Sequence, residues 1–164
     1  MQKNRKELIK NITLTGVMAA IYVVCVILFG DLSFGYSGFI SFRVAEILIP
    51  LCCFDKKFMP GAIVGCFIAN LYGGQVADII FGTIQSAFTV CALYYIKNKY
   101  LAITIGALLC GIIIGLELVA LGFSSIGYWI ILTVFLGELF ILFVGYFVAK
   151  KCFFSLNNKN IGKK

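Results

Sequence analysis

Six charged residues lie within or beside long apolar stretches of this sequence, where a charge is costly to bury. They are five acids and one arginine: Asp31, Arg43, Glu46, Asp78, Glu117 and Glu138. A carboxylate in such a place can accept hydrogen bonds from a cationic or donor-rich ligand, or two carboxylates can act as acid and base. The sequence has no histidine, which excludes imidazole chemistry and histidine-bound metals. No nucleophile or metal cluster accompanies the acids, so the pattern favours ligand binding, with no catalytic residue, metal or cofactor.

Arg43 and Glu46 are three residues apart, so a helix places them on the same face. The structural interpretation is an internal ion pair that fixes the helix within the protein. This interpretation is compatible with a ligand role for either residue.

A polar stripe runs along the apolar segment at 76–96. Asp78, Gly82, Gln85 and Thr89 recur at helical spacing, so they form one face that points into a helix bundle. For Gln85 and Thr89 we expect hydrogen bonds between helices. For Asp78, which lies close to Gln75 and a Gly-Gly break, we favour contact with a ligand.

Other polar and aromatic candidates lie near the ends of predicted helices. Asn70 can bind a ligand or hydrogen-bond the following turn, and Glu117 and Glu138 are isolated carboxylates that need a proton, the arginine or a wet cavity. Tyr72 and Trp129 can stack on a planar ligand, although an aromatic belt at the membrane interface also explains them. We therefore predict a ligand site from Arg43, Glu46, Asn70, Gln75, Asp78 and Glu117, with Glu138, Trp129 and Tyr72 as secondary candidates.

The composition identifies the environment of these residues. Of 164 residues, 62% are hydrophobic and 13% charged, whereas a soluble domain is about 45–50% apolar and about 25% charged. So few charges cannot cover a soluble surface, so we predict an all-α integral membrane protein in which residues 1–164 form a single domain.

Six apolar segments predict a six-helix transmembrane bundle. Their approximate limits are 11–29, 43–54, 58–72, 76–96, 101–121 and 126–149. As an α-helix, the second would rise only about 18 Å, short of the roughly 30 Å hydrocarbon core. We therefore expect protein to shelter it and the Gly-rich loop at 30–42 to fold over the bundle.

The distribution of basic residues predicts the orientation in the membrane. With six spans, 13 of the 14 Lys and Arg residues fall on the side of the two termini and of the loops at 55–57 and 97–99. By the positive-inside rule, both termini are cytoplasmic. The net charge of +7 is thus a topology signal and no indication of nucleic-acid binding.

Small residues at four-residue spacing predict close helix contacts. Most such pairs, including Gly61 with Gly65 and Gly111 with Gly115, are expected to pack inside the bundle. Gly16 and Ala20 lie away from the acidic segments in sequence, so they are candidates for contact with another protein. The seven cysteines are interpreted as packing residues, because they form no C-x-x-C pair.

Three stretches resemble the queuosine-precursor transporter family known as QueT. They are FRVAEILIP (Phe42–Pro50), PGAIVGCFIANLYGG (Pro60–Gly74) and DIIFGTIQSA (Asp78–Ala87), supported by AAIYVV (Ala19–Val24). Members are substrate-binding S components of energy-coupling-factor (ECF) transporters. The resemblance implies six helices, a pocket open to the outside, a first loop acting as an extracellular lid, and docking on a transmembrane coupling subunit with two cytoplasmic ATPases. It also implies that Gly16-x-x-x-Ala20 contacts the coupling subunit.

The function implied is capture of queuosine, queuine or a 7-deazaguanine precursor at the cell membrane. The acids fit such a ligand, since a guanine-like edge offers an N–H and an amine to one carboxylate, and an aminomethyl group needs a second. We expect Glu46 and Asp78 to share these roles. The alternatives are an S component for another vitamin or nucleobase, a small membrane enzyme using paired carboxylates, and a structural membrane subunit without a ligand.

Overall fold

The computed structural model describes residues 2–30, 33, 43–122 and 129–161, and every element in them is a helix. In chain order the elements are α1 (Gln2–Phe29), η1 (Val44–Cys53), η2 (Lys56–Phe58), α3 (Met59–Gly73), α4 (Val76–Tyr95), α5 (Lys99–Ala120) and α6 (Trp129–Ile161). The predicted all-α class is confirmed. The predicted lid at 30–42 lies mostly outside the described residues.

Four of the described helices are long and apolar enough to cross a membrane. These spans are Asn4–Phe29, Val76–Tyr95, Lys99–Ala120 and Trp129–Phe154. The other two expected spans correspond to η1, of 10 residues, and α3, of 15 residues. The structure therefore supports a multi-pass membrane protein, and a count of six spans stays a prediction.

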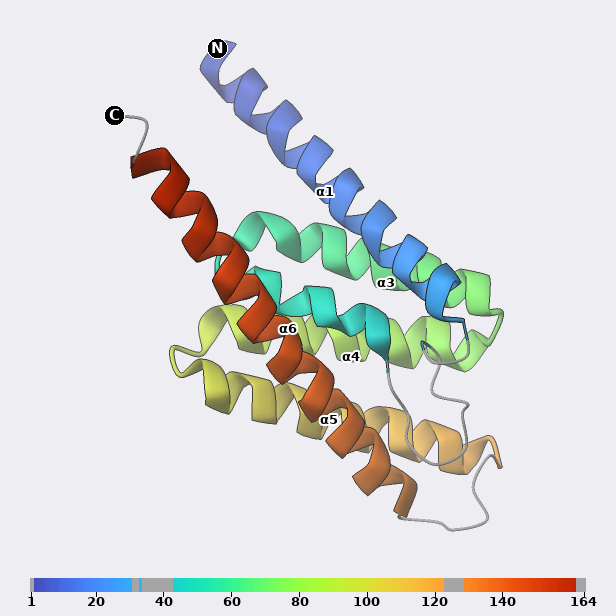
Figure 1. The fold of residues 1–164 in the computed structure, drawn as a ribbon. Coiled ribbons are helices and arrows are strands. Elements are labelled where there is room, and N and C mark those ends of the chain that lie inside the picture. Colours follow the sequence, from blue (N-terminus) through green and yellow to red (C-terminus); the bar gives the residue numbers. More distant parts are fainter. Residues whose placement is uncertain (1, 31–32, 34–42, 123–128, 162–164) are drawn as a thin grey trace.

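The first and the last helix are longer than the sequence predicted. α1 begins at Gln2 instead of residue 11, and α6 continues to Ile161 instead of ending at residue 149. The prediction followed the apolar runs, but a helix satisfies its own backbone hydrogen bonds and can continue through polar residues. Both extensions lie at the same end of the molecule, where α1 and α6 project beyond the other helices (Figure 1).

The second segment is a 3-10 helix, which corrects the expected α-helix at residues 43–54. η1 spans Val44–Cys53 with Pro50 inside it. At about 2.0 Å per residue its ten residues rise about 20 Å, which is still short of a bilayer core. Pro50 has no N–H to donate, so it cannot complete a regular α-helical ladder.

The expected shelter of this segment is confirmed. η1 packs against α1, α3, α4 and α6, and Figure 1 shows it in the middle of the bundle. Gly145 of α6 makes this approach possible, because a Cβ there would collide with the backbone of Ile47. The sequence neighbours around the bundle, α3 with α4, α4 with α5 and α5 with α6, also pack against each other.

Glycines bring two further helix pairs into close contact. A Cβ added at Gly61 would lie 2.6 Å from the Cβ of Met18, and one at Gly65 would lie 2.8 Å from the Cβ of Tyr22. These two glycines therefore hold α3 against α1. Gly111 and Gly115 bring α5 against Phe135 and Ile131 of α6 in the same way.

One end of the bundle carries basic residues from the first and last helices and from the α4–α5 connection. The start of α1, the end of α6 and the α4–α5 connection lie at one end, and the α3–α4 turn lies at the other (Figure 1). Lys99 stabilises the α4–α5 connection by donating from Nζ to the carbonyl oxygens of Leu93 (2.7 Å) and Ile96 (3.0 Å).

We predict that the basic end faces the cytoplasm, and single cysteines can test this orientation. In a background without native cysteines, a membrane-impermeant thiol reagent applied to intact cells should label Gln75→Cys and not Lys97→Cys. Both positions lie in helix connections at opposite ends of the bundle. Permeabilised cells provide the control, since both variants should then react. Labelling of Lys97→Cys alone in intact cells would reverse the orientation.

Candidate functional site

The predicted ion pair between Arg43 and Glu46 forms the centre of a buried polar network. Arg43 Nη1 lies 3.3 Å from Glu46 Oε1. Arg43 is 4% exposed and Glu46 is 0% exposed. A 3-10 helix has three residues per turn, so it places residues three apart directly above one another. The pair is therefore internal, as the structural interpretation of the sequence predicted.

The predicted polar stripe of α4 provides the partners of this pair. Asp78, Gly82, Gln85 and Thr89 are all buried, which confirms the common inward face. Arg43 Nη1 donates to Gln85 Oε1 at 3.1 Å, and Gln85 Nε2 donates to Thr89 Oγ1 at 3.1 Å. Gln85 thus links η1 to α4, which is the interhelical role expected of it.

Ser86 belongs to the same network, although the sequence analysis did not select it. Its hydroxyl lies 3.0 Å from Glu46 Oε1 and 3.1 Å from Gln85 Oε1, and it is fully buried. It also lies 3.2 Å from the sulfur of Cys66 on α3. The signal for its inward position was its spacing of four residues from Gly82 on the polar stripe.

Gly82 makes room for the charged groups of the site. A Cβ there would lie 2.7 Å from Arg43 Nη2 and 2.8 Å from Asn70 Nδ2. The amide of Asn70 donates to the backbone oxygen of Asp78 at 2.9 Å. Asn70 therefore ties the end of α3 to the first turn of α4, across the short connection that contains Gly74.

Glu138 adds a second carboxylate to the centre of the bundle. It lies on α6, is 1% exposed, and interacts electrostatically with Glu46 and Arg43. Neither of its oxygens, nor Oε2 of Glu46, has a hydrogen-bond partner among the described residues. Arg43 is the one buried basic side chain in the described part of the chain. The centre therefore has two carboxylates for one guanidinium, and several unused acceptor oxygens.

A second acidic pair lies nearer the α3–α4 turn. Asp78 on α4 is 6% exposed, Glu117 on α5 is 7% exposed, and the two interact with each other. The step from Asp78 to Gln85 corresponds to about 10 Å along α4, so this pair lies roughly two turns from the central network. Gln75 is the half-buried residue that precedes α4. The predicted site residues thus lie in two layers of the bundle.

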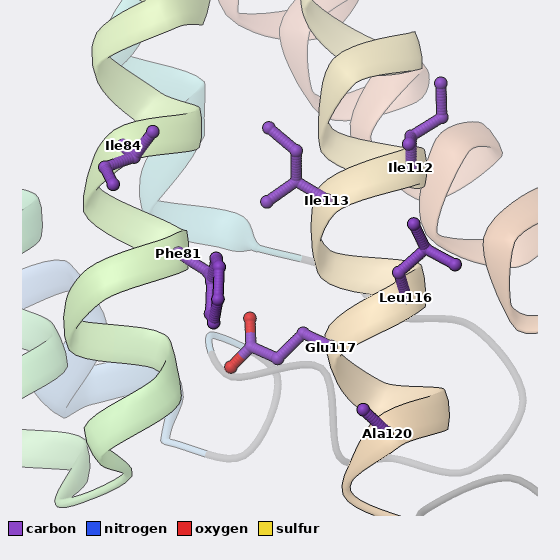
Figure 2. Close-up of a pocket in the computed structure, with 7 residues that line it drawn as sticks. All are labelled: Phe81, Ile84, Ile112, Ile113, Leu116, Glu117 and Ala120. Atoms are coloured by element: carbon purple, nitrogen blue, oxygen red, sulfur yellow. The ribbon is translucent and has the colours of Figure 1, made fainter.

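Glu117 also lines a groove between α4 and α5. The groove has a volume of about 470 Å³. Its lining consists of Phe81, Ile84, Ile112, Ile113, Leu116, Glu117 and Ala120. Figure 2 shows the carboxylate of Glu117 in the space between the two helices, beside the ring of Phe81. Glu117 is the one charged residue of an otherwise apolar lining.

The two aromatic candidates lie on the surface of the bundle. Tyr72 and Trp129 are each 65% exposed. This position suits an interfacial aromatic belt, and their role as stacking residues stays a prediction.

The small-residue pair of α1 faces outward. Gly16 and Ala20 are exposed, and a Cβ added at Gly16 would meet no atom within 4 Å. By contrast, α1 itself occupies the space beside Gly61 and Gly65. Gly16 and Ala20 are therefore free of internal packing among the described residues, as a contact site for another protein requires.

The cysteines are unpaired throughout, as expected from their spacing. All seven are free thiols, of which Cys52, Cys66 and Cys110 are buried while Cys91 and Cys152 are exposed. The packing interpretation therefore holds for the buried cysteines and not for the exposed ones.

Comparison with known proteins identifies the family. The sequence profile of the QueT transporter family matches residues 12–152, a range that includes all the buried acids described above. The chain belongs to the QueT transporter family. Among curated proteins, it is 30% identical over 82 residues to the queuosine precursor transporter QueT of Lactococcus lactis subsp. cremoris (strain MG1363). No solved structure matches the chain.

The similarity to the Lactococcus QueT protein covers part of each chain. The aligned region is 50% of this chain and 48% of the relative, so the chain matches about half of the relative's length. Membership of the QueT transporter family agrees with the four candidate membrane spans of the chain, which indicate a multi-pass membrane protein. The substrate, the partners and the ligand residues are matters of proposal.

Proposed function

We propose that this chain is the substrate-binding membrane subunit of an ECF-type importer, which captures queuosine, queuine or a 7-deazaguanine precursor from outside the cell. A separate transmembrane coupling subunit and two cytoplasmic ATPases would move the substrate, so ATP hydrolysis takes place in the partners and not in this chain. Membership of the QueT family and the name of the Lactococcus relative support the substrate class.

The observation that carries the substrate proposal is the surplus of buried carboxylates. Four acids, Glu46, Asp78, Glu117 and Glu138, are buried in the described part of the chain with Arg43 as the one buried base. Oxygens of Glu46, Glu117 and Glu138 lack hydrogen-bond partners there. Acceptors without donors are costly inside a membrane protein, so a ligand rich in N–H groups or with a cationic amine complements them.

We assign the two ends of the substrate to the two layers of the site. Asp78, flanked by Asn70 and Gln75, would accept the N–H groups of the guanine-like edge. Glu46 and Glu138 would accept the aminomethyl group, whose positive charge supplements that of Arg43. Arg43 would orient Glu46 through their ion pair. Glu117 interacts with Asp78 but also opens on the α4–α5 groove, so its substrate role stays a prediction.

The experiment that tests this function is mass spectrometry of small molecules released from the detergent-purified protein. We expect a 7-deazaguanine compound, and titration calorimetry with queuine and its aminomethyl precursor should then give saturable binding. Release of another vitamin or nucleobase would replace the substrate and keep the transport role. A protein that releases nothing and binds neither compound would contradict the proposal.

The exposed pair on α1 is the proposed contact with the coupling subunit. Gly16→Leu should abolish uptake of the substrate by cells and leave binding by the isolated protein unchanged, because the added side chain enters open space in this chain and blocks close approach of a partner helix. Uptake assays and calorimetry measure the two effects.

Gly65→Leu is the matched control for this substitution. Its side chain would collide with Tyr22 and Ala19, so it should lower the melting temperature and reduce both uptake and binding. Equal loss of ligand binding in Gly16→Leu would show that Gly16 supports the internal packing instead.

A further inference from the structure

The α4–α5 groove opens on the apolar surface of the bundle and not on the central polar network. Its lining side chains Phe81, Ile84, Ile112 and Leu116 are 42–50% exposed, and they belong to two of the candidate membrane spans. In a membrane these side chains face the hydrocarbon chains of lipids. The groove is therefore a lipid-facing feature, distinct from the proposed substrate site.

Glu117 is out of place in such a groove unless something covers it. Its side chain is more than nine-tenths buried, its Oε2 has no hydrogen-bond partner among the described residues, and its carboxylate lies in the space between α4 and α5 (Figure 2). Asp78 interacts with Glu117, also through a hydrogen bond between the two side chains, but it brings no positive charge. A carboxylate that borders the hydrocarbon region requires a donor or a positive charge nearby.

The position of Glu117 along α5 suits a lipid headgroup. α5 ends at Ala120, so Glu117 lies about 4.5 Å along the axis from that end. This end of the bundle is the one opposite the basic termini (Figure 1). From Ile112 to Ala120 the apolar lining covers about 12 Å of helix, which offers a path for an acyl chain directed toward the middle of the membrane.

We infer that the α4–α5 groove binds a phospholipid with a primary amine headgroup, whose acyl chain lies between Ile84 and Ile112 and whose ammonium group donates to Glu117. The membrane surrounding these spans supplies this occupant, and its charge and shape match the two parts of the groove. A lipid with three N–H donors satisfies the free Glu117 oxygen by a charge-assisted hydrogen bond. Phosphatidylcholine has the charge without the donors, and phosphatidylglycerol has neither the charge nor the amine.

Native mass spectrometry of the full chain, released from bilayers with equal amounts of phosphatidylethanolamine, phosphatidylcholine and phosphatidylglycerol, tests the inference. The unaltered protein should retain phosphatidylethanolamine about 10-fold over the other two, which is the lower range for one charge-assisted bond. Glu117→Gln should abolish the preference. Glu7→Gln is the control, because it is the same acid-to-amide change at an exposed residue near the start of α1, far from the groove. This variant should keep the preference for phosphatidylethanolamine.

A second variant separates the groove from its carboxylate. Ala120 is exposed and lines the groove, so Ala120→Phe should fill part of the space, leave the fold intact and reduce retention of all three lipids. Equal retention of the three lipids by the unaltered protein, or a preference that survives Glu117→Gln, would overturn the inference. So would undiminished phosphatidylethanolamine retention by Ala120→Phe.

Discussion

Replacement of Arg43 by methionine is expected to destabilise the protein by about 3–5 kcal/mol, the cost of removing one partner from a buried ion pair. The substitution would leave Glu46 buried without its cation and remove the donor to Gln85. The substitution would also leave the carboxylates of Glu46 and Glu138 beside each other without the positive charge of Arg43. Thermal and denaturant unfolding of the purified protein in detergent measures the loss.

Two further variants show whether the loss comes from the unpaired charge. Arg43→Met combined with Glu46→Gln should recover most of the lost stability, because replacing both partners removes the uncompensated carboxylate. Arg5→Met removes an exposed arginine from the start of α1 and should change stability little. If the double variant is as unstable as Arg43→Met, the stabilisation by Arg43 comes from its hydrogen bond to Gln85 and its packing against Gly82 instead of from the ion pair.

Substitution of Asp78 by asparagine is expected to weaken substrate binding by roughly 10–150-fold, which corresponds to the 1.5–3 kcal/mol of a hydrogen bond to a charged group. Asparagine keeps the shape of the side chain, and the backbone oxygen of Asp78 still accepts from Asn70. The change also removes a negative charge beside Glu117, so the melting temperature should stay the same or rise.

Calorimetry with queuine and its aminomethyl precursor, together with thermal melting, measures both effects of Asp78→Asn. Asp55→Asn is the matched control: Asp55 accepts from the backbone N–H of Lys57 at the start of η2, and asparagine can cap a helix equally well. Unchanged affinity for both compounds would remove Asp78 from the ligand site. Weaker affinity together with a large fall in melting temperature would assign Asp78 a structural role.

The course of the polar residues along α4 could be predicted from sequence. Asp78, Gly82, Gln85 and Thr89 share a face because the α-helix has 3.6 residues per turn, and all four are buried. The pairing of Arg43 with Glu46 followed from their spacing in the same way. Periodicity, however, places residues within one helix and says nothing about which helix the face meets.

The contacts between helices were therefore beyond the sequence analysis. Glu138 was an isolated carboxylate in sequence, and only the packing of α6 on η1 places it beside Glu46. Ser86 also joins the network through tertiary packing, because η1 packs against α4 and places Glu46 next to the Ser86 hydroxyl. The groove beside Glu117 depends on the side chains of both α4 and α5.

The glycines show the same division between local and tertiary information. Gly16 and Gly65 both occur in small-x-x-x-small pairs with similar sequence signals, yet Gly65 is filled by α1 while Gly16 is open. A missing side chain permits close approach, and the rest of the fold decides whether a helix of the same chain makes that approach.

By itself, the sequence determined the membrane environment, the gathering of basic residues at the termini and two connections, the inward face of α4 and the family resemblance. These properties depend on composition and on spacing within single elements, which the order of residues specifies directly. The tertiary structure alone decided the 3-10 form of η1 within the bundle, the contact of Glu138 with the Arg43–Glu46 pair, and the position of Glu117 in the groove between α4 and α5. Each of these depends on which surfaces of distant segments pack together, and that is settled by shape and by compensation of buried charge over the whole bundle.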